Sequence, residues 1–171
     1  MLPLGHFVVE LGPHRKSLNL GGLRSGGTRS LPYQLKKSAA GATVVSRNKK
    51  VVETWLEGLG RMDRSALQSC LAEDAERVEW ADGFPESGVP QRGQAAIIKN
   101  IDRPANVAVS FELMRLTEEG DVVVAEGTAR VVPKGSAPMT LKFCDIFEFK
   151  RGKVRRLDSF TARIKDSTAT A

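Results

Sequence analysis

The most informative segment for the fold of this chain is Leu141-Lys142-Phe143-Cys144-Asp145-Ile146-Phe147-Glu148-Phe149. Apolar and polar side chains alternate along it, which predicts a β-strand with one buried face. That face carries Phe143, Phe147 and Phe149, with Asp145 in the middle. Burying an unpartnered, ionised carboxylate is costly, so we expect a raised pKa for Asp145 or a hydrogen-bond donor beside it. The strand therefore predicts either an acid in a pocket or a structural carboxylate.

Charge is divided unevenly along the 171 residues. Residues 1–48 contain seven Lys or Arg and one acid, Glu10, which accounts for the whole net charge of +6. Residues 49–171, the neutral body, contain 19 basic and 19 acidic residues. A neutral body argues against nucleic-acid and anionic-membrane partners there. No apolar run approaches the ~18 residues of a membrane span.

Residue types that support nucleophilic or metal chemistry are missing from the neutral body. Both histidines, His6 and His14, and the single tyrosine, Tyr33, precede it. A Ser-His-Asp triad, a Cys-His pair and a histidine zinc site are thereby excluded from the body. Cys70 and Cys144 have no CxxC spacing, so we expect two reduced, buried thiols and no metal. Acid–base chemistry must then use Asp, Glu, Lys or Cys.

The chain divides into a leader, one domain and a tail. Residues 1–47 mix Gly, Ser, Pro and Arg without periodicity, which predicts a disordered or leader segment. The same composition is typical of an organellar transit peptide, and a start codon placed too far upstream is a third alternative. Residues 48–165 suffice for one domain with a core, and residues 166–171 form a disordered tail. We expect a cytoplasmic protein, or an organellar one if the leader is a transit peptide.

Helix and strand patterns in residues 48–165 predict an α+β domain. Three helices are expected, one capped by Asn48 and stopped by Gly60, one capped by Asp63, and one over residues 94–101. Alternation predicts strands at residues 76–80, 107–114, 122–132, 141–149 and 153–164. Short turns join the last four strands, so we expect a strongly curved antiparallel sheet with the helices on one face.

Four segments of the body carry a family resemblance. They are the helix Val51–Trp55, the strand end Val78–Gly83, the helix start Gly93–Ile97, and Cys144–Phe149 running into Gly152-Lys153-Val154. In this order and at these distances they resemble the SnoaL-like proteins of the nuclear transport factor 2-like superfamily. The resemblance covers residues 48–164. It implies a cone-shaped sheet, two to three helices closing a pocket, and a homodimer through the open face of the sheet.

One enzyme family of that superfamily, the ketosteroid isomerases, allows a residue-level comparison. There a tyrosine on the first helix and a protonated aspartate on a late strand form an oxyanion hole. Asp145 matches the aspartate, and Trp55 stands where the tyrosine would be, with an indole N–H that can donate one hydrogen bond. The general base of the family would lie near Trp80, and Asp82 is the carboxylate that could substitute.

The limonene-epoxide hydrolases offer a second comparison. They use a Tyr-x-Asn pair and an Asp-Arg-Asp relay. Trp80-Ala81-Asp82 occupies the place of the pair, and Asp158 resembles the last acid of the relay. Glu126-Gly127-Thr128-Ala129 stands where the Arg-x-Asp of the relay would be, so the sequence departs from the pattern that activates water.

The candidate site residues are two catalytic carboxylates, Asp145 and Asp82, and four substrate-binding aromatic residues, Trp55, Trp80, Phe143 and Phe147. Each has a structural alternative. A basic group or backbone N–H can hold Asp145, Asp82 lies in an Asp-Gly turn, and the aromatic rings can fill the core. Asp158 lies near three arginines, which favours a surface ion pair.

Two functional hypotheses follow. The first is a cofactor-independent isomerase, cyclase or hydratase that acts on a small apolar molecule bearing a carbonyl group. Asp145 would donate a proton or a hydrogen bond to the developing oxyanion, with Asp82 as second carboxylate and no metal. The alternative is a non-catalytic ligand-binding or dimerisation module of the same fold, favoured by the missing Tyr, His and relay Arg.

Overall fold

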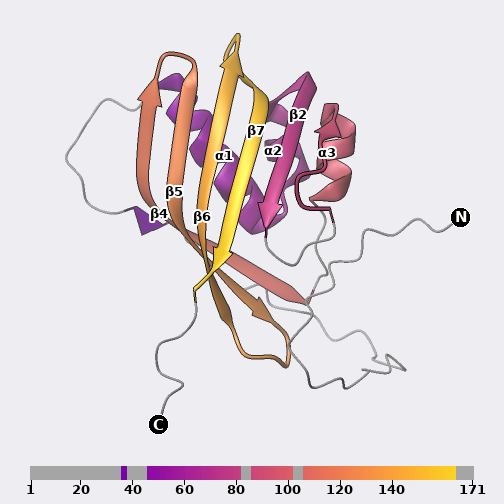
Figure 1. Ribbon diagram of the computed structural model, residues 1–171, viewed down its shortest axis with the longest axis vertical. Coiled ribbons are helices and arrows are strands. Elements are labelled where there is room, and N and C mark those ends of the chain that lie inside the picture. Colours follow the sequence, from indigo (N-terminus) through magenta and orange to yellow (C-terminus); the bar gives the residue numbers. More distant parts are fainter. Residues whose placement is uncertain (1–35, 38–45, 82–85, 102–105, 165–171) are drawn as a thin grey trace, which may run out of the picture.

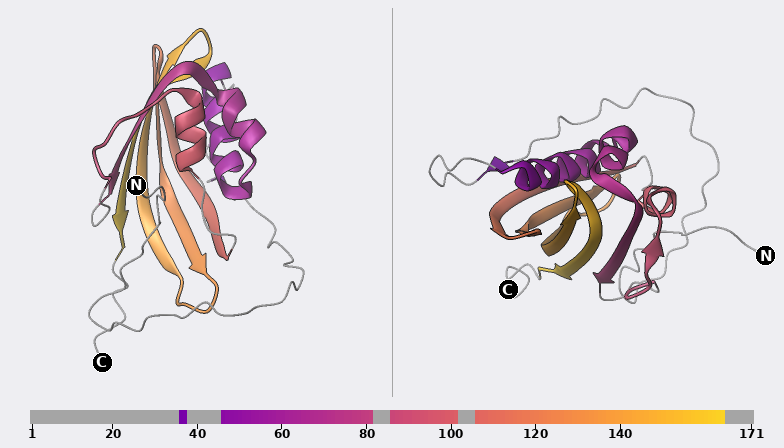
Figure 2. Two further views of the ribbon diagram at one scale, coloured as in Figure 1. Left: turned by 90° about the vertical axis from the view of Figure 1, so that its right-hand side faces the viewer. Right: turned by 90° about the horizontal axis from the view of Figure 1, so that it is seen from above.

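A computed structural model of the protein describes residues 36–37, 46–81, 86–101 and 106–164. Within these residues the helices are α1 (Arg47–Arg61), α2 (Arg64–Cys70) and α3 (Gln94–Asn100). The strands are β1 (Lys36–Lys37), β2 (Leu71–Ala81), β3 (Gln91–Arg92), β4 (Val107–Glu119), β5 (Val122–Pro133), β6 (Met139–Lys150) and β7 (Lys153–Arg163). They form one curved sheet with the helices on one side (Figures 1 and 2), which is the expected α+β class.

The sheet is mixed, with strand order β1-β4-β5-β6-β7-β2-β3. Strands β4 to β7 form the antiparallel meander that their short turns predict. β2 instead pairs in parallel with β7, and β1 pairs in parallel with β4. Short turns determine the direction of consecutive strands only, so they could not predict these two pairings. Through β1, two residues of the predicted leader join the edge of the sheet.

The ends of α1 differ from those predicted. Ser46, not Asn48, is the cap, because its extended backbone lets the Ser46 hydroxyl accept from the backbone N–H of Lys49 at 3.1 Å. The helix also continues past Gly60. It ends where Met62 takes the left-handed conformation, with φ 56°, and its N–H reaches the carbonyls of the last turn.

The β6–β7 hairpin matches its prediction closely. Arg151 and Gly152 form its turn with φ values of 54° and 73°. The register then slips, since Glu148 pairs with Arg156 while Phe149 pairs with Val154. This bulge allows two side chains of β7 that are out of phase, Val154 and Leu157, to be buried on the same face.

The core lies between the helices and the face of the sheet turned toward them, which we call the inner face (Figure 2). Its largest fully buried side chains include Trp55 from α1, Leu67 from α2, Ile97 from α3, and Phe147 from β6. Gly127 lies under the ring of Phe143, where a Cβ would come within 2.7 Å of that ring. No helix within the described ranges is long and apolar enough to cross a membrane.

Candidate functional site

Asp145 lies at the centre of β6 on the inner face. Its register neighbours are Ala125 on β5 and Ser159 on β7. The residue is 4 % exposed, and its Oδ1 accepts a hydrogen bond from the Ser159 hydroxyl at 2.5 Å. Burial raises the pKa of Asp145 to about 6, although Ser159 and the nearby charge of Arg77 act to lower it. A carboxyl that titrates close to neutrality is suited to proton transfer.

A second pair of charged groups reaches the inner face from β2. The parallel register sets Arg77 beside Leu157 and Glu79 beside Ser159, so Asp145, Ser159 and Glu79 occupy one row across three strands. Arg77 Nη2 lies 2.9 Å from Glu79 Oε2. Arg77 is buried, whereas the side chain of Glu79 is 31 % exposed and is the member of the pair open to solvent.

A side chain from β3 completes the group. Gln91 Oε1 accepts from Arg77 Nη1 at 3.4 Å. Arg77 Nε is buried and has no hydrogen-bond partner among the described residues. We call these five residues the Asp145 cluster: Asp145, Ser159, Arg77, Glu79 and Gln91. Asp145 itself accepts from Ser159 and, in the described part of the chain, from no basic side chain.

Three of the four predicted aromatic residues lie on the same side of the sheet as Asp145. Trp55, Phe143 and Phe147 are each at most 3 % exposed and belong to one core cluster. The ring of Phe143 packs edge-on against Phe111 at 5.8 Å between centroids. Asp145 is therefore a carboxyl enclosed by aromatic and aliphatic side chains, where its charged form is poorly solvated.

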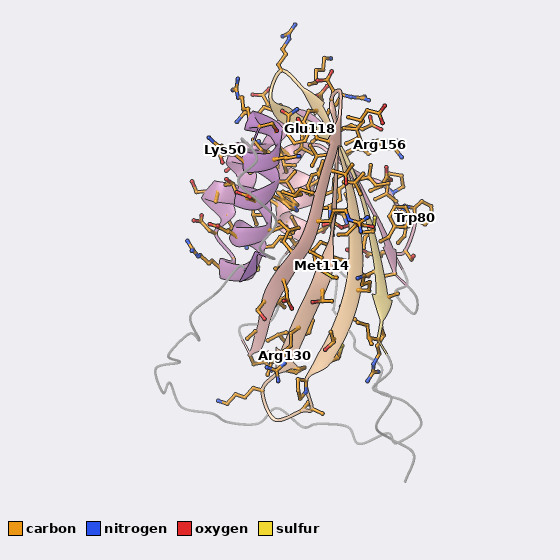
Figure 3. All side chains as sticks on the ribbon, turned by 90° about the vertical axis from the view of Figure 1, so that its left-hand side faces the viewer. Lys50, Trp80, Met114, Glu118, Arg130 and Arg156 are labelled. Atoms are coloured by element: carbon orange, nitrogen blue, oxygen red, sulfur yellow. The ribbon has the colours of Figure 1, made fainter. Side chains whose placement is uncertain are left out.

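Trp80 lies on the opposite face of the sheet, which we call the outer face (Figure 3). The residue is 44 % exposed, and its ring stacks on that of Phe160 with centroids 6.1 Å apart. Strand alternation explains the separation, since Glu79 points inward and its neighbour Trp80 must point outward. Asp82, the second predicted carboxylate, lies outside the described residues.

Asp158 also points to the outer face. It accepts from Nε and Nη2 of Arg156 at 2.7 and 3.2 Å, which is the surface ion pair expected as its structural alternative. A shallow hollow of about 290 Å³ lies on this face as well, lined by Thr117, Glu119, Val122 and Val124. Both features are separated from Asp145 by the sheet.

Sequence reasoning missed Arg77, Glu79 and Ser159. Their signals were present but weak: Arg77 and Glu79 are two apart on a predicted strand, and so share one face. Neighbouring Val78 and Trp80 are apolar, which favours the opposite face as the buried one. Ser159 carried no signal beyond its place next to Asp158. The parallel pairing of β2 with β7 is what brings these side chains to Asp145.

Comparison with known proteins gives a family and a fold. The family model of the SnoaL-like domain matches residues 52–157. An LEH-like epoxide hydrolase of M. tuberculosis is 20 % identical, with TM-score 0.57, over 68 % of this chain and 83 % of its own. An NTF2-like protein of unknown function from Burkholderia pseudomallei is 24 % identical, with TM-score 0.60, over 67 % and 89 %.

A third solved structure is TerC co-crystallised with polyporic acid. It is 24 % identical, with TM-score 0.59, over 72 % of this chain and 95 % of its own. No curated protein matches the chain. At these identities the three structures show a shared fold, that of the NTF2-like proteins.

Proposed function

Because the chain belongs to the SnoaL-like domain family, we propose that it is a cofactor-independent acid–base enzyme whose acid is Asp145. The reaction would be an isomerisation, cyclisation or hydration of a small apolar molecule that carries a carbonyl group. The observation that carries this proposal is a fully buried carboxyl with a pKa of about 6, held by one serine hydroxyl among aromatic side chains. Trp55, Phe143 and Phe147 would contact the apolar part of the substrate.

The contacts of Asp145 suggest how a proton would move. Ser159 occupies Oδ1, so Oδ2 is the oxygen that would carry the proton. From there the acid donates to the substrate carbonyl oxygen as negative charge develops on it. Glu79, in the same row and partly exposed, is the second carboxylate that the described residues offer. Two carboxyls in such different surroundings are able to take the roles of acid and base.

Deuterium exchange at carbon tests the proposal without knowledge of the natural substrate. The probe is 4-phenylbutan-2-one in D₂O, whose protons next to the carbonyl are followed by proton NMR. We expect the protein to accelerate their exchange and Asp145→Asn to lower that rate by about 10²–10⁴-fold. Asp158→Asn, the matched control on the outer face, should leave the rate unchanged. If the native protein does not accelerate exchange, the enzyme proposal is wrong.

A second proposal concerns the outer face, which carries large exposed apolar side chains: Trp80 at 44 %, Phe160 at 41 % and Met114 at 54 %. We propose that two copies of the chain associate through this face to form a homodimer. The non-catalytic alternative, a ligand-binding or dimerisation module, would keep this dimer and lose the exchange activity. Light scattering should give twice the chain mass, and Trp80→Glu should halve it. A native mass of one chain would refute the dimer.

The proposal also includes the domain bounds, the compartment and the partners of the protein. We place the domain at residues 48–165, extended by the α1 start at Ser46 and Arg47 and by strand β1, with the rest of residues 1–47 and residues 166–171 outside it. We place the protein in the cytoplasm, without nucleic-acid or membrane partners. The neutral charge of residues 49–171 supports the absence of a polyanionic partner. Trp80 would not contact a substrate bound at Asp145, because it lies across the sheet from that residue.

A further inference from the structure

Arg77 is the one basic side chain that is buried in the described part of the chain, at 9 % exposure. A guanidinium is always charged and offers five N–H donors in a rigid plane. Taking it out of water is costly unless its donors are matched by acceptors. A donor of Arg77 that lacks an acceptor therefore indicates where a ligand oxygen could bind.

Those hydrogen bonds leave the side of Arg77 that carries Nε unmatched. Nη2 reaches Glu79 at 2.9 Å, Nη1 reaches Gln91 only at 3.4 Å, and Nε finds no acceptor among the described residues. The solvent-exposed arginines nearby behave differently. Arg92 Nε lies 2.9 Å from Glu76, and Arg156 Nε lies 2.7 Å from Asp158. The orphan donor is thus found where desolvation makes it most costly.

The position of the orphan donor points to a ligand. Arg77 and Asp145 come from different strands on the same face, with only the Ser159 strand between them. Glu79 alone holds the guanidinium at short distance, and the Nε–H is left without an acceptor that an incoming oxygen could supply. A ligand oxygen placed between the two residues would accept from Arg77 and from the protonated carboxyl of Asp145.

We infer that the ligand of the Asp145 cluster carries a carboxylate and that the Arg77 guanidinium binds it beside Asp145. The inference rests on the proposed function and narrows its substrate class to small acids with an apolar body. Charge favours this class below about pH 6, because Glu79 compensates only the positive charge of Arg77 and Asp145, then mostly protonated, repels no anion. Planar two-oxygen groups also match the guanidinium fork.

A matched pair of probes tests this inference. 3-Phenylpropanoate and 4-phenylbutan-2-one have the same shape, but one carries a carboxylate where the other carries a methyl ketone. Their dissociation constants are measured by NMR titration at about pH 5.5, where Asp145 is mostly protonated and 3-phenylpropanoate is mostly ionised. A charge-assisted hydrogen bond should make the native protein bind the acid about ten- to a hundredfold more tightly than the ketone.

Variants assign that preference to Arg77. Arg77→Gln should abolish the preference for the acid while leaving the affinity for the ketone unchanged. Arg156→Gln, the control on the outer face, should change neither affinity. If Arg77→Gln does not fold, Arg77→Lys is the second variant. It keeps the positive charge without the planar fork and should reduce the preference for the acid. The preference of the native protein for the acid over the ketone tests the inference in either case.

The possible results separate the two proposals. Binding of the ketone but not of the acid, or equal binding of both, overturns the inference and leaves the acid–base enzyme standing. A loss of both affinities in Arg77→Gln with a folded protein also overturns it, because Arg77 would then be a structural residue. If neither probe binds the native protein and no exchange is seen, the proposed function is lost as well.

Discussion

Two carboxylates on opposite faces of the sheet, Asp158 and Asp145, have opposite surroundings. On the outer face, Glu76 is shared by Arg92 and Arg156, and Arg156 also pairs with Asp158. On the inner face, Asp145 has a serine and no basic partner in the described part of the chain. Asp158 and Ser159 are adjacent in sequence, yet one joins the surface network and the other the buried cluster. The immediate surroundings, rather than the residue type, decide the state of a carboxylate, since Glu79 on the inner face is also paired, with Arg77, and Asp145 is not.

This contrast has an energetic basis. Exposed ion pairs gain little, because water screens the charges and two long side chains lose freedom, so each contributes about 0–1 kcal/mol. A buried carboxyl without an ion pair favours its protonated form instead. Its ionisation therefore lowers the stability of the fold. The inner face therefore accepts a permanent cost at neutral pH, and the outer face does not. Such a cost is typical of functional sites.

The largest expected difference between the faces concerns the two tryptophans. Trp55→Ala removes a ring that is 1 % exposed and should lower the free energy of unfolding by about 3–5 kcal/mol. Trp80→Ala removes a ring that is 44 % exposed and should cost less than about 1 kcal/mol in the monomer. Urea unfolding at low protein concentration measures both. Equal costs would contradict the division into a packed inner face and an open outer face.

The pH dependence of stability gives the next effect. The pKa of Asp145 is 3.8 in the unfolded reference and about 6 in the fold, so its ionisation opposes folding. The penalty is absent below pH 3.8, grows up to about pH 6 and is complete above it. Asp145→Asn has no such penalty and keeps an oxygen for Ser159. It should be more stable than the native protein by about 2–3 kcal/mol at pH 8.

Two comparisons check that interpretation. At pH 4 the stabilities of Asp145→Asn and the native protein should be close, since both groups are then largely neutral. Asp158→Asn removes an ion-paired carboxylate and should lower stability at pH 8, opposite in sign to Asp145→Asn. Chemical denaturation at both pH values provides the measurement. A loss of stability in Asp145→Asn at pH 8 would mean that its carboxylate is a structural acceptor.

The smallest expected effect on stability is that of the exposed ion pairs of Arg156 on the outer face. Arg156→Gln breaks the pairs with Glu76 and Asp158 and should lower the free energy of unfolding by less than about 1 kcal/mol. Added salt should reduce the difference further, because it screens exposed charges. A cost of several kcal/mol that persists in high salt would show that the outer face is desolvated, as it would be inside a dimer.

Local features of the fold were predictable wherever the determinants are close in sequence. Asp63 caps α2 through its hydrogen bond from the Ala66 N–H at 3.0 Å, and Gly152 forms the expected tight turn. Alternation along β6 was sufficient to turn Asp145 toward the core. The cap of α1 was misplaced by two residues, because Ser46 and Asn48 are both good caps and only the backbone geometry selects between them.

The α+β class, the meander of β4 to β7, the family and the burial of Asp145 could all be predicted from sequence, because periodicity and turn residues act over a few positions. The surroundings of that carboxyl depend instead on contacts between strands that are distant in sequence. Arg77 lies next to Leu157, 80 positions away, through a parallel pairing that no local pattern encodes. The same pairing turned the charged side of β2 inward and Trp80 outward, against the local preference, because the strand follows the faces of its neighbours in the sheet.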